Sequence, residues 1–409
     1  MFNNIRRFVD KIKPNFVEGG KFAWLQSTFE AFETFAFTPN RVTKRGSHVR
    51  DAIDLKRAMI MVVIALVPAM LFGMWNIGYQ HYQAVPETFN FQLSTFNFFW
   101  YCLWFGFLRM LPMLAVSYIV GLGIEFTFAQ IRHHEVNEGF LVTGFIIPMI
   151  VPVTTPLWQL ALAVAFAVII GKEVFGGTGM NFLNPALVAR AFLFFAYPTR
   201  MSGDNVWIAA DLWGTDAITS ATPLAELAAG VHPSASALDM FIGTIPGSTC
   251  ETSVIAILLG AILLLFTGIA SWRIMLAVIL GGGLMGLSFN LLSTFNFPQL
   301  STLNPQLSTY FQLPFYYHYL MGGFMFGAVF MATDPVTAAQ TNTGKWIYGL
   351  LIGIFAVMLR VINPAYPEGM MLSILLMNCF APLIDHCVVA RNIKMRQQRA
   401  LNLSKTVKS

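Results

Sequence analysis

Long apolar segments separated by short polar ones run along most of the chain from residue 58 onward. A helix that crosses a bilayer needs about 20 mostly apolar residues, and roughly 17 can suffice. The third to fifth segments are short and interrupted by prolines and a glycine cluster, so we expect irregular borders there. The pattern predicts ten membrane-spanning helices, at 58–76, 100–126, 139–154, 157–172, 183–198, 253–270, 273–291, 317–333, 346–362 and 370–390.

The Lys and Arg residues outside these segments predict how they are oriented, because cytoplasmic loops carry the excess of both. The N-terminal region 1–57 and the tail 391–409 are rich in them. The loops on the opposite side of the membrane, including 199–252, contain a single basic residue of this kind, Arg200. Both termini are therefore predicted in the cytoplasm, and 199–252 is predicted on the periplasmic side. The internal loops on the cytoplasmic side contain Arg132, Lys172, Arg273 and Lys345.

Ten spans divide into two halves of five, at 58–198 and 253–390. An odd number of spans per half predicts an inverted repeat, in which cofactor or ion sites lie at broken helices between the repeats. Two stretches look broken, GGTGMNFLNPA (176–186) and MATDPVTAAQTNTG (331–344). The two halves share little sequence, so the pattern leaves the repeat open.

The composition supports the same class of fold. Hydrophobic residues make up 56% of the 409 positions and charged residues only 11%, whereas a soluble domain has about 25% charged residues. We therefore expect an all-α integral membrane protein in contact with lipid and no nucleic-acid partner. None of the four cysteines has CxxC spacing, which argues against a disulfide framework and against a zinc or iron–sulfur site.

A Leu-Ser-Thr core recurs at 91–98, 291–297, 299–304 and 306–310. All four copies fall in predicted outer loops. A polar repeat of this kind is typical of a tolerated insertion, and we assign it no chemistry.

Three carboxylates lie within or at the ends of predicted spans, Glu125, Asp334 and Asp385. Charged groups in the bilayer are costly and usually functional. Carboxylates suit Na⁺ or a proton relay, and all three are predicted toward the cytoplasmic side. The alternative is that they pair with Lys or Arg or cap helix ends, as Asp334 could do.

The segment GKEVFGGTGMNFLNP (171–185) combines Lys172 and Glu173 with a glycine-rich turn and with Asn181 and Asn184. Glycines let a ligand approach backbone N–H groups, and a helix start after them can bind an anion or a polar ring. The Walker spacing is absent, so no nucleoside triphosphate site is expected. A re-entrant turn explains the pattern equally well.

The loop 199–252 contains a small polar stretch, GTDAITSATPLAELAAG (214–230), in which Thr222 precedes Pro223. A hydroxyl beside proline is ordinary turn chemistry. The residues alone therefore favour a turn over a chemical role for Thr222.

Several segments resemble the NqrB family, the membrane subunits of sodium-translocating NADH:quinone oxidoreductases. They are 171–198, 245–251, 268–274, 330–338 and 360–375, and 42–61 and 134–143 fit as well. The resemblance spans essentially the whole chain. The sister family, the RnfD subunits of the ion-pumping ferredoxin:NAD oxidoreductase, shares the core but usually lacks the long N-terminal extension, so residues 1–57 favour the quinone-linked enzyme.

The resemblance implies a covalently bound FMN. In the family, the last threonine of an Asp-x-x-Ser/Thr-x-Ala-Thr signature carries FMN through a phosphoester bond made by a separate flavin transferase outside the cytoplasm. Asp216, Thr219, Ala221 and Thr222 occupy the signature positions. Ser220 stands where glycine is common in the family, a small-for-small change.

The resemblance further implies a non-covalent riboflavin, a quinone site near the cytoplasmic surface, and sodium export by a translocase of the bacterial inner membrane. Electrons would pass from the NqrC partner through FMN and riboflavin to quinone, with subunits A, C, D, E and F of the complex as partners. Glu125, Asp334 and Asp385 match acids implicated in sodium uptake. A flavin-free channel or secondary transporter is the alternative from another class.

A Gly-Gly pair that the family ties to quinone or inhibitor binding often precedes the first of these acids. Here the sequence reads Gly121-Leu122, with Gly123 next. This departure leaves the shape of the quinone pocket open.

Overall fold

The structure, a computed structural model, describes most of the chain from residue 55 onward. The described residues are 7, 9–16, 22, 26, 29, 33, 43, 45–47, 55–84, 95–132, 139–201, 208–209, 221–294, 305–363 and 367–408. Helices make up the regular structure of this part, which contains no β-strand. The short helix η1 (Lys13–Asn15) lies near its start and follows the helical residues 9–12. Six helices of the described part are long and apolar enough to cross a membrane, so this is an integral membrane protein of the all-α class.

The first half of the bundle contains five apolar helices. They are α3 (Leu55–Ala84), α4 (Thr95–Arg132), α5 (Phe140–Ile150), α6 (Leu157–Gly171) and α7 (Pro185–Ala196), with the short η4 (Glu173–Phe175) after α6. Helix α4 extends well past the predicted 100–126 at both ends. Helices α5 and α7 are short, as the interrupted pattern predicts.

Short helices connect the halves and extend the second half. They are α8 (Pro198–Met201), α9 (Pro223–Ala228), α10 (Ala237–Ile242) and α14 (Pro305–Gln312). The longer helices of the second half are α11 (Val254–Thr267), α12 (Trp272–Thr294), α17 (Asn342–Ile362) and α18 (Met370–Lys408). Residues 391–402 of the tail continue α18, and their side chains are exposed. Residues 306–310, which belong to a predicted outer loop, lie in the short helix α14 between α12 and α15.

The predicted span 317–333 is not one helix. It consists of α15 (Tyr317–Leu320), α16 (Phe324–Phe326) and a π-helical turn, η5 (Gly327–Met331). Gly322 interrupts it with φ +63°, a conformation that favours glycine. Hydropathy alone could not reveal this break, because the segment is mostly apolar on both sides of Gly322.

Small residues allow close helix packing, as is common in membrane bundles. A Cβ atom added to Gly353 of α17 would lie 2.1 Å from the carbonyl oxygen of Val278 in α12. Between the halves, a Cβ atom at Gly260 of α11 would lie 2.3 Å from the carbonyl oxygen of Ala65 in α3. All four cysteines are free in the structure.

Several helix contacts recur in both halves, whereas the extensive packing of α3 on α4 has no counterpart between α11 and α12. The second helix packs on the fourth (α4 on α6, α12 on α17), and the fourth packs on the fifth (α6 on α7, α17 on α18). The broken third element contacts the fifth in each half (α5 with α7, η5 with α18). This correspondence favours the internal repeat that the sequence pattern left open.

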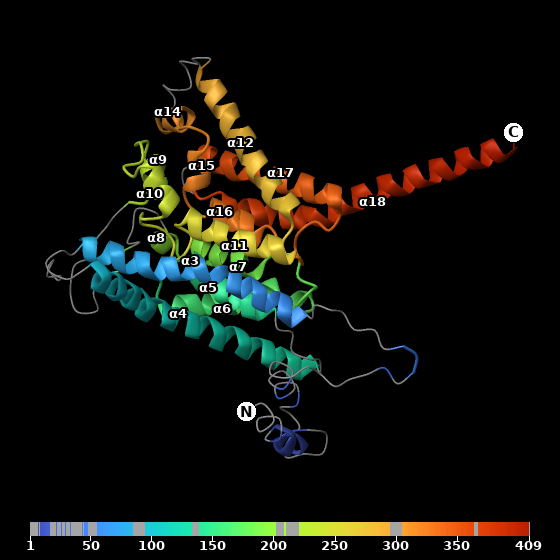
Figure 1. The fold of residues 1–409 in the computed structure, drawn as a ribbon, viewed down its shortest axis with the longest axis horizontal. Helices are drawn as coiled ribbons and strands as arrows, with labels where there is room; N and C mark the ends of the chain where they lie inside the picture. The colour runs from blue at the N-terminus through green and yellow to red at the C-terminus, as the bar shows by residue number, and fades with distance from the viewer. Residues whose placement is uncertain are drawn as a thin grey trace.

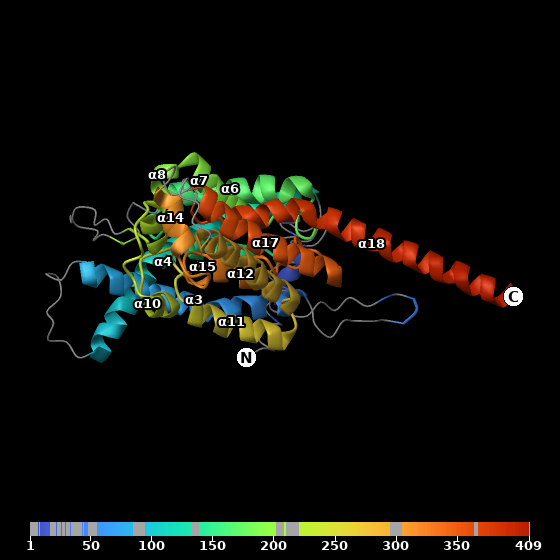
Figure 2. The ribbon, with the colours of Figure 1, turned by 90° about the horizontal axis from the view of Figure 1, so that it is seen from above.

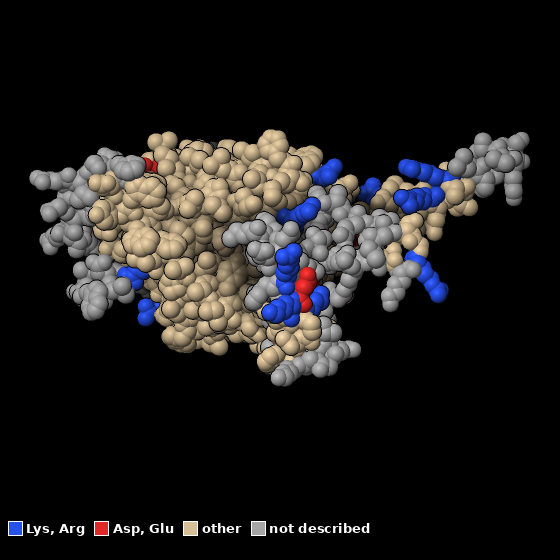
Figure 3. Space-filling view, turned by 60° about the horizontal axis from the view of Figure 1, so that its bottom comes forward, with Lys and Arg blue, Asp and Glu red and all other residues tan. Residues whose placement is uncertain are grey.

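The two ends of the bundle differ. Helix α3 begins at the end where α18 leaves the bundle, which we call the α18 end, and α9, α10 and α14 lie at the opposite end, the α9 end (Figure 1; Figure 2). Figure 3 shows an uncharged body with most of the visible Lys and Arg side chains toward the α18 end.

Candidate functional site

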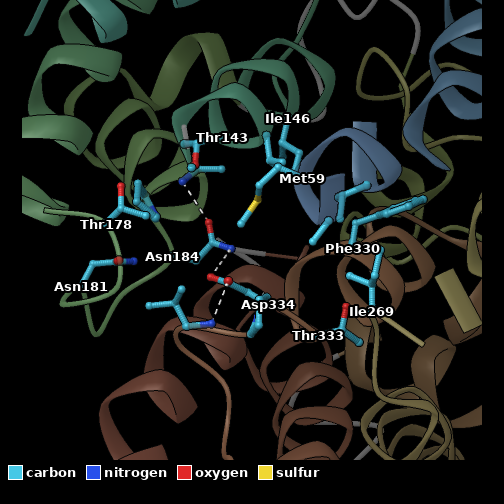
Figure 4. Close-up of a pocket in the computed structure, with 18 of the residues that line it drawn as sticks. Met59, Thr143, Ile146, Thr178, Asn181, Asn184, Ile269, Phe330, Thr333 and Asp334 are labelled. Carbon is cyan, nitrogen blue, oxygen red and sulfur yellow. Dashed lines mark hydrogen bonds between the residues drawn. The ribbon is translucent and has the colours of Figure 1, made fainter. Parts of the chain in front are cut away.

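A cavity of about 320 Å³ lies between the two halves at the α18 end. Ala58 and Met59 of α3, residues of α5 and part of 172–186 line it from the first half, and Phe330 and 333–336 line it from the second. Figure 4 shows these side chains converging from both halves. Its volume lies in the range of small-molecule sites, about 300–1,000 Å³.

Asn184 and Asp334 meet across this cavity (Figure 4), where the Asn184 amide donates to Asp334 Oδ2 at 3.5 Å. Asn184 also caps α7, since its Oδ1 accepts from the Ala186 N–H at 3.0 Å. The Asp334 carboxylate accepts from the Val336 N–H at 3.2 Å and from the Thr337 hydroxyl at 2.9 Å. The two predicted broken stretches therefore face each other.

The glycine-rich segment forms a turn that only glycine readily permits. Gly176, Gly177 and Gly179 have φ values of +119°, +91° and +91°, in the region that side chains disfavour. The turn brings Thr178 and Asn181 into the cavity wall. The predicted turn thus forms part of the cavity wall and contributes polar groups to it.

Lys172 forms the part of the wall next to α4. Its ammonium makes an ion pair with Glu125, and both side chains are 4% exposed. The Lys172 Nζ atom lies 5.9 Å from the ring centroid of Phe140. That ring rests on Gly121, where an added Cβ atom would lie 1.8 Å from Cζ, whereas a Cβ atom at Gly123 would meet nothing within 4 Å.

Asp385 joins α18 to the start of α17 at the same end. Its carboxylate accepts from the Gln340 N–H at 2.6 Å, the Thr341 N–H at 3.0 Å and the Thr341 hydroxyl at 2.5 Å. Glu125, Asp334 and Asp385 therefore each have separate partners. In the described part of the chain, no three His, Cys, Asp or Glu side chains lie together as a metal site.

Thr222 lies at the α9 end and is 9% exposed. Its Oγ1 atom caps α9 by accepting from the Ala225 N–H at 3.2 Å. Ala221 is exposed, whereas Asp216, Thr219 and Ser220 lie outside the described residues.

A buried ion cluster at the α9 end was missed by the sequence reasoning. Arg190 of α7 donates to Glu251 Oε2 at 2.8 Å, to Ser248 Oγ at 3.3 Å and to Glu368 Oε2. Burial, opposed by the charge of Arg190, raises the pKa of Glu368 to about 7. The signal that could have revealed the cluster is an arginine inside a predicted span.

Arg360 is a second arginine inside a predicted span, 346–362. It is fully buried, and its guanidinium donates to the carbonyl oxygens of Pro367, His318 and Met321 at 3.2, 2.7 and 3.1 Å. It thereby holds α17 against the broken segment and the loop before α18.

Comparison with known proteins gives a match over most of the chain. Residues 42–394 match the family described as NQR2, RnfD, RnfE. The chain is also similar to NqrB proteins, named as subunits of the Na(+)-translocating NADH-quinone reductase, from three organisms. These are Ectopseudomonas mendocina (51% identity), Azotobacter vinelandii (49%) and Pseudomonas aeruginosa strain LESB58 (46%), each over 97% of this chain and 99% of the relative.

Proposed function

The chain belongs to the NQR2, RnfD, RnfE family, and we propose that it is the NqrB subunit of a sodium-translocating NADH-quinone reductase. The observation that carries this function is the roughly half-identical alignment over nearly the full length of both chains. The sister ferredoxin-linked enzyme is a relative within the family only. The chain thus serves as a membrane subunit of a multi-subunit translocase that reduces quinone and moves Na⁺.

We assign a covalent FMN to Thr222. The threonine lies at the α9 end, and the excess of Lys and Arg toward the opposite end supports a periplasmic position for it. The Thr222 oxygen acts as an acceptor in its cap, and no hydrogen bond donated by this hydroxyl is found among the described residues. A phosphoester would therefore replace a proton that holds no structural contact there.

We assign a non-covalent riboflavin to the cavity. Its wall is largely apolar and offers the amides of Asn181 and Asn184 and the hydroxyl of Thr178, which suits a flat ring with a polar edge. A flavin held there supplies one-electron chemistry. Met59 and Phe330 would hold the flavin as apolar parts of the wall, and the enclosed site would limit the access of water.

The quinone approaches from the α4 surface around Gly123, where the backbone is unobstructed. Glu125, Asp334 and Asp385 contribute to the sodium path at the α18 end. The proposed partners are the other subunits of the complex and a flavin transferase. The proposed location is the inner membrane, with both termini in the cytoplasm.

Covalent attachment is tested by flavin fluorescence of the denatured protein in a gel and by its mass. Wild type fluoresces and exceeds the sequence mass by one bound FMN, and Thr222→Val loses both signals. Ser236→Ala is the matched control, because Ser236 caps the equally short α10 and its loss should leave the flavin in place. Fluorescence that persisted in Thr222→Val would place the attachment elsewhere.

The reaction is tested on the purified complex with quinone, and separately with ferredoxin and NAD. Quinone reduction that depends on Na⁺ supports the proposed function. Activity only with ferredoxin would assign the chain to the sister enzyme, and a colourless complex would favour a channel or transporter.

A further inference from the structure

We propose that the Lys172 ammonium is an internal cation that competes with Na⁺ for Glu125. It leaves Glu125 for the cavity when the molecule bound there becomes negatively charged. This inference rests on the proposed function, because it requires a redox-active occupant of the cavity.

The position of Lys172 between Glu125 and the cavity carries the argument. Lys172 lines the cavity, whereas Glu125 is not among the lining residues. Both side chains are 4% exposed, and a buried charge that loses its partner is costly. Each charge must therefore be balanced in every state of the protein.

The ion pair occupies the carboxylate that Na⁺ would need. Sodium favours oxygen ligands such as a carboxylate, but a carboxylate already paired with an ammonium has little attraction left for a second cation. Glu125 thus becomes a sodium ligand only when Lys172 turns away from it.

The other charged groups around the pair have partners of their own. Glu173 lies against Arg132, with Oε2 3.6 Å from NH1, and its carbonyl accepts from Arg132 NH2 at 2.8 Å. Asp334, across the cavity, accepts from Val336 and Thr337. Among the described residues, the cavity is thus the alternative destination for the ammonium.

The side chain of Lys172 suits this exchange. Its ammonium is a point charge on a flexible four-carbon stem, so it can change partners without backbone movement. The Phe140 ring, 5.9 Å from Nζ, offers a surface that attracts a cation along the way. Gly121 allows that ring to sit there, since any side chain at this position would collide with it.

The charges balance through the cycle. Each electron from NADH adds one negative charge to the cavity, the ammonium turns toward it, and one Na⁺ takes its place at Glu125. When the electron leaves for quinone, the ammonium returns to Glu125 and displaces the Na⁺. Sodium binding is thereby tied to electron arrival.

The test compares Lys172→Met, Lys172→Arg and Glu125→Gln in the purified complex. It measures the sodium concentration for half-maximal quinone reduction and the reduction potential of the non-covalent flavin. Lys172→Met should lower the half-saturating sodium concentration by about tenfold or more, because a competing charge is removed. It should also lower the potential, and Lys172→Arg should restore both values toward wild type.

Glu125→Gln should raise the potential and abolish the sodium dependence, because the ammonium is then free for the cavity. Lys345→Met is the control, since Lys345 lies at the same end in α17 and does not line the cavity. A purely structural ion pair would lower stability in both variants and move neither the potential nor the sodium response.

The inference is overturned if Lys172→Met keeps the non-covalent flavin and has both the half-saturating sodium concentration and the flavin potential of the wild type. If Lys172→Met fails to assemble, the neutral pair Glu125→Gln/Lys172→Met decides, because its potential must lie below that of Glu125→Gln. An equal potential in these two would refute the inference. A wild-type complex without a non-covalent flavin, or without sodium dependence, would instead refute the proposed function.

Discussion

Arg190 connects the two halves of the bundle at the α9 end, and we expect its loss to be strongly destabilising. Its guanidinium is 3% exposed and lies between Glu251, which precedes α11, and Glu368, which precedes α18. Replacing Arg190 with methionine keeps a long apolar side chain but leaves both carboxylates without this counter-charge. The variant therefore tests a charge effect with little loss of packing volume.

The structure allows the size and pH dependence of the effect to be estimated. Breaking a buried ion pair by removing one partner costs about 3–5 kcal/mol. The pKa of Glu368 is raised to about 7 even though Arg190 lowers it, so without Arg190 it rises further. At pH 6 Glu368 then binds a proton and no longer needs a counter-charge, and we expect a clearly smaller loss of stability at pH 6 than at pH 8.

The assay is thermal unfolding of the purified protein in detergent at pH 6 and pH 8. Arg200→Met is the matched control, because Arg200 is exposed in α8 near the same end and its loss should change little. The triple variant Arg190→Met/Glu251→Gln/Glu368→Gln should recover most of the stability, since removing a whole buried ion group is often nearly neutral. An Arg190→Met variant with the wild-type midpoint at pH 8, or with equal losses at both pH values, would refute this reasoning.

Three further predictions concern the α18 end. Gly121→Ala should displace the Phe140 ring, whose Cζ atom lies 1.8 Å from the added Cβ position, and reduce quinone reduction severalfold; a wild-type rate in this variant would contradict a role of this part of α4 in the reaction. Asn184→Ala removes the cap of α7 and the contact with the opposite half. The amount of non-covalent flavin extracted from the protein should therefore fall, while the in-gel fluorescence of the covalent flavin persists. Full retention of both flavins would contradict the assignment of the cavity. Asp385→Asn should weaken the three contacts to 340–341 and lower the free energy of unfolding by about 1–3 kcal/mol. Because Asp385 is a carboxylate of the proposed ion path, its loss should also alter the sodium dependence of quinone reduction.

The order of the apolar segments could be predicted from the sequence because the bilayer imposes it locally. A chain in lipid must satisfy its backbone hydrogen bonds within each segment, so long apolar runs become helices wherever they occur. This reasoning identified α12 and α17 closely, whereas α3 continues to Ala84, well past its predicted end at 76. It did not reveal the ends of α4 and α18, because helices that leave the membrane continue as long as local propensity allows.

The candidate site could be predicted only in part. Asn181, Asn184 and the glycine turn were recognised from their residue types, and Glu125 and Asp334 from their charge in apolar surroundings. Their partners could not be recognised, since Lys172 pairs with a residue 47 positions away and Arg190 with residues 61 and 178 positions away. Thr222 would have remained an ordinary turn residue without the family resemblance.

The sequence by itself determined that this chain is helical and lies in a membrane, because composition and segment length decide which solvent each residue can tolerate. Only the tertiary structure decided which charges meet, where the span 317–333 breaks, and that a cavity lies between the halves at one end. These features depend on contacts between distant segments. The free energy of such a contact depends on both residues and on their distance in the fold, so it cannot be inferred from either position alone.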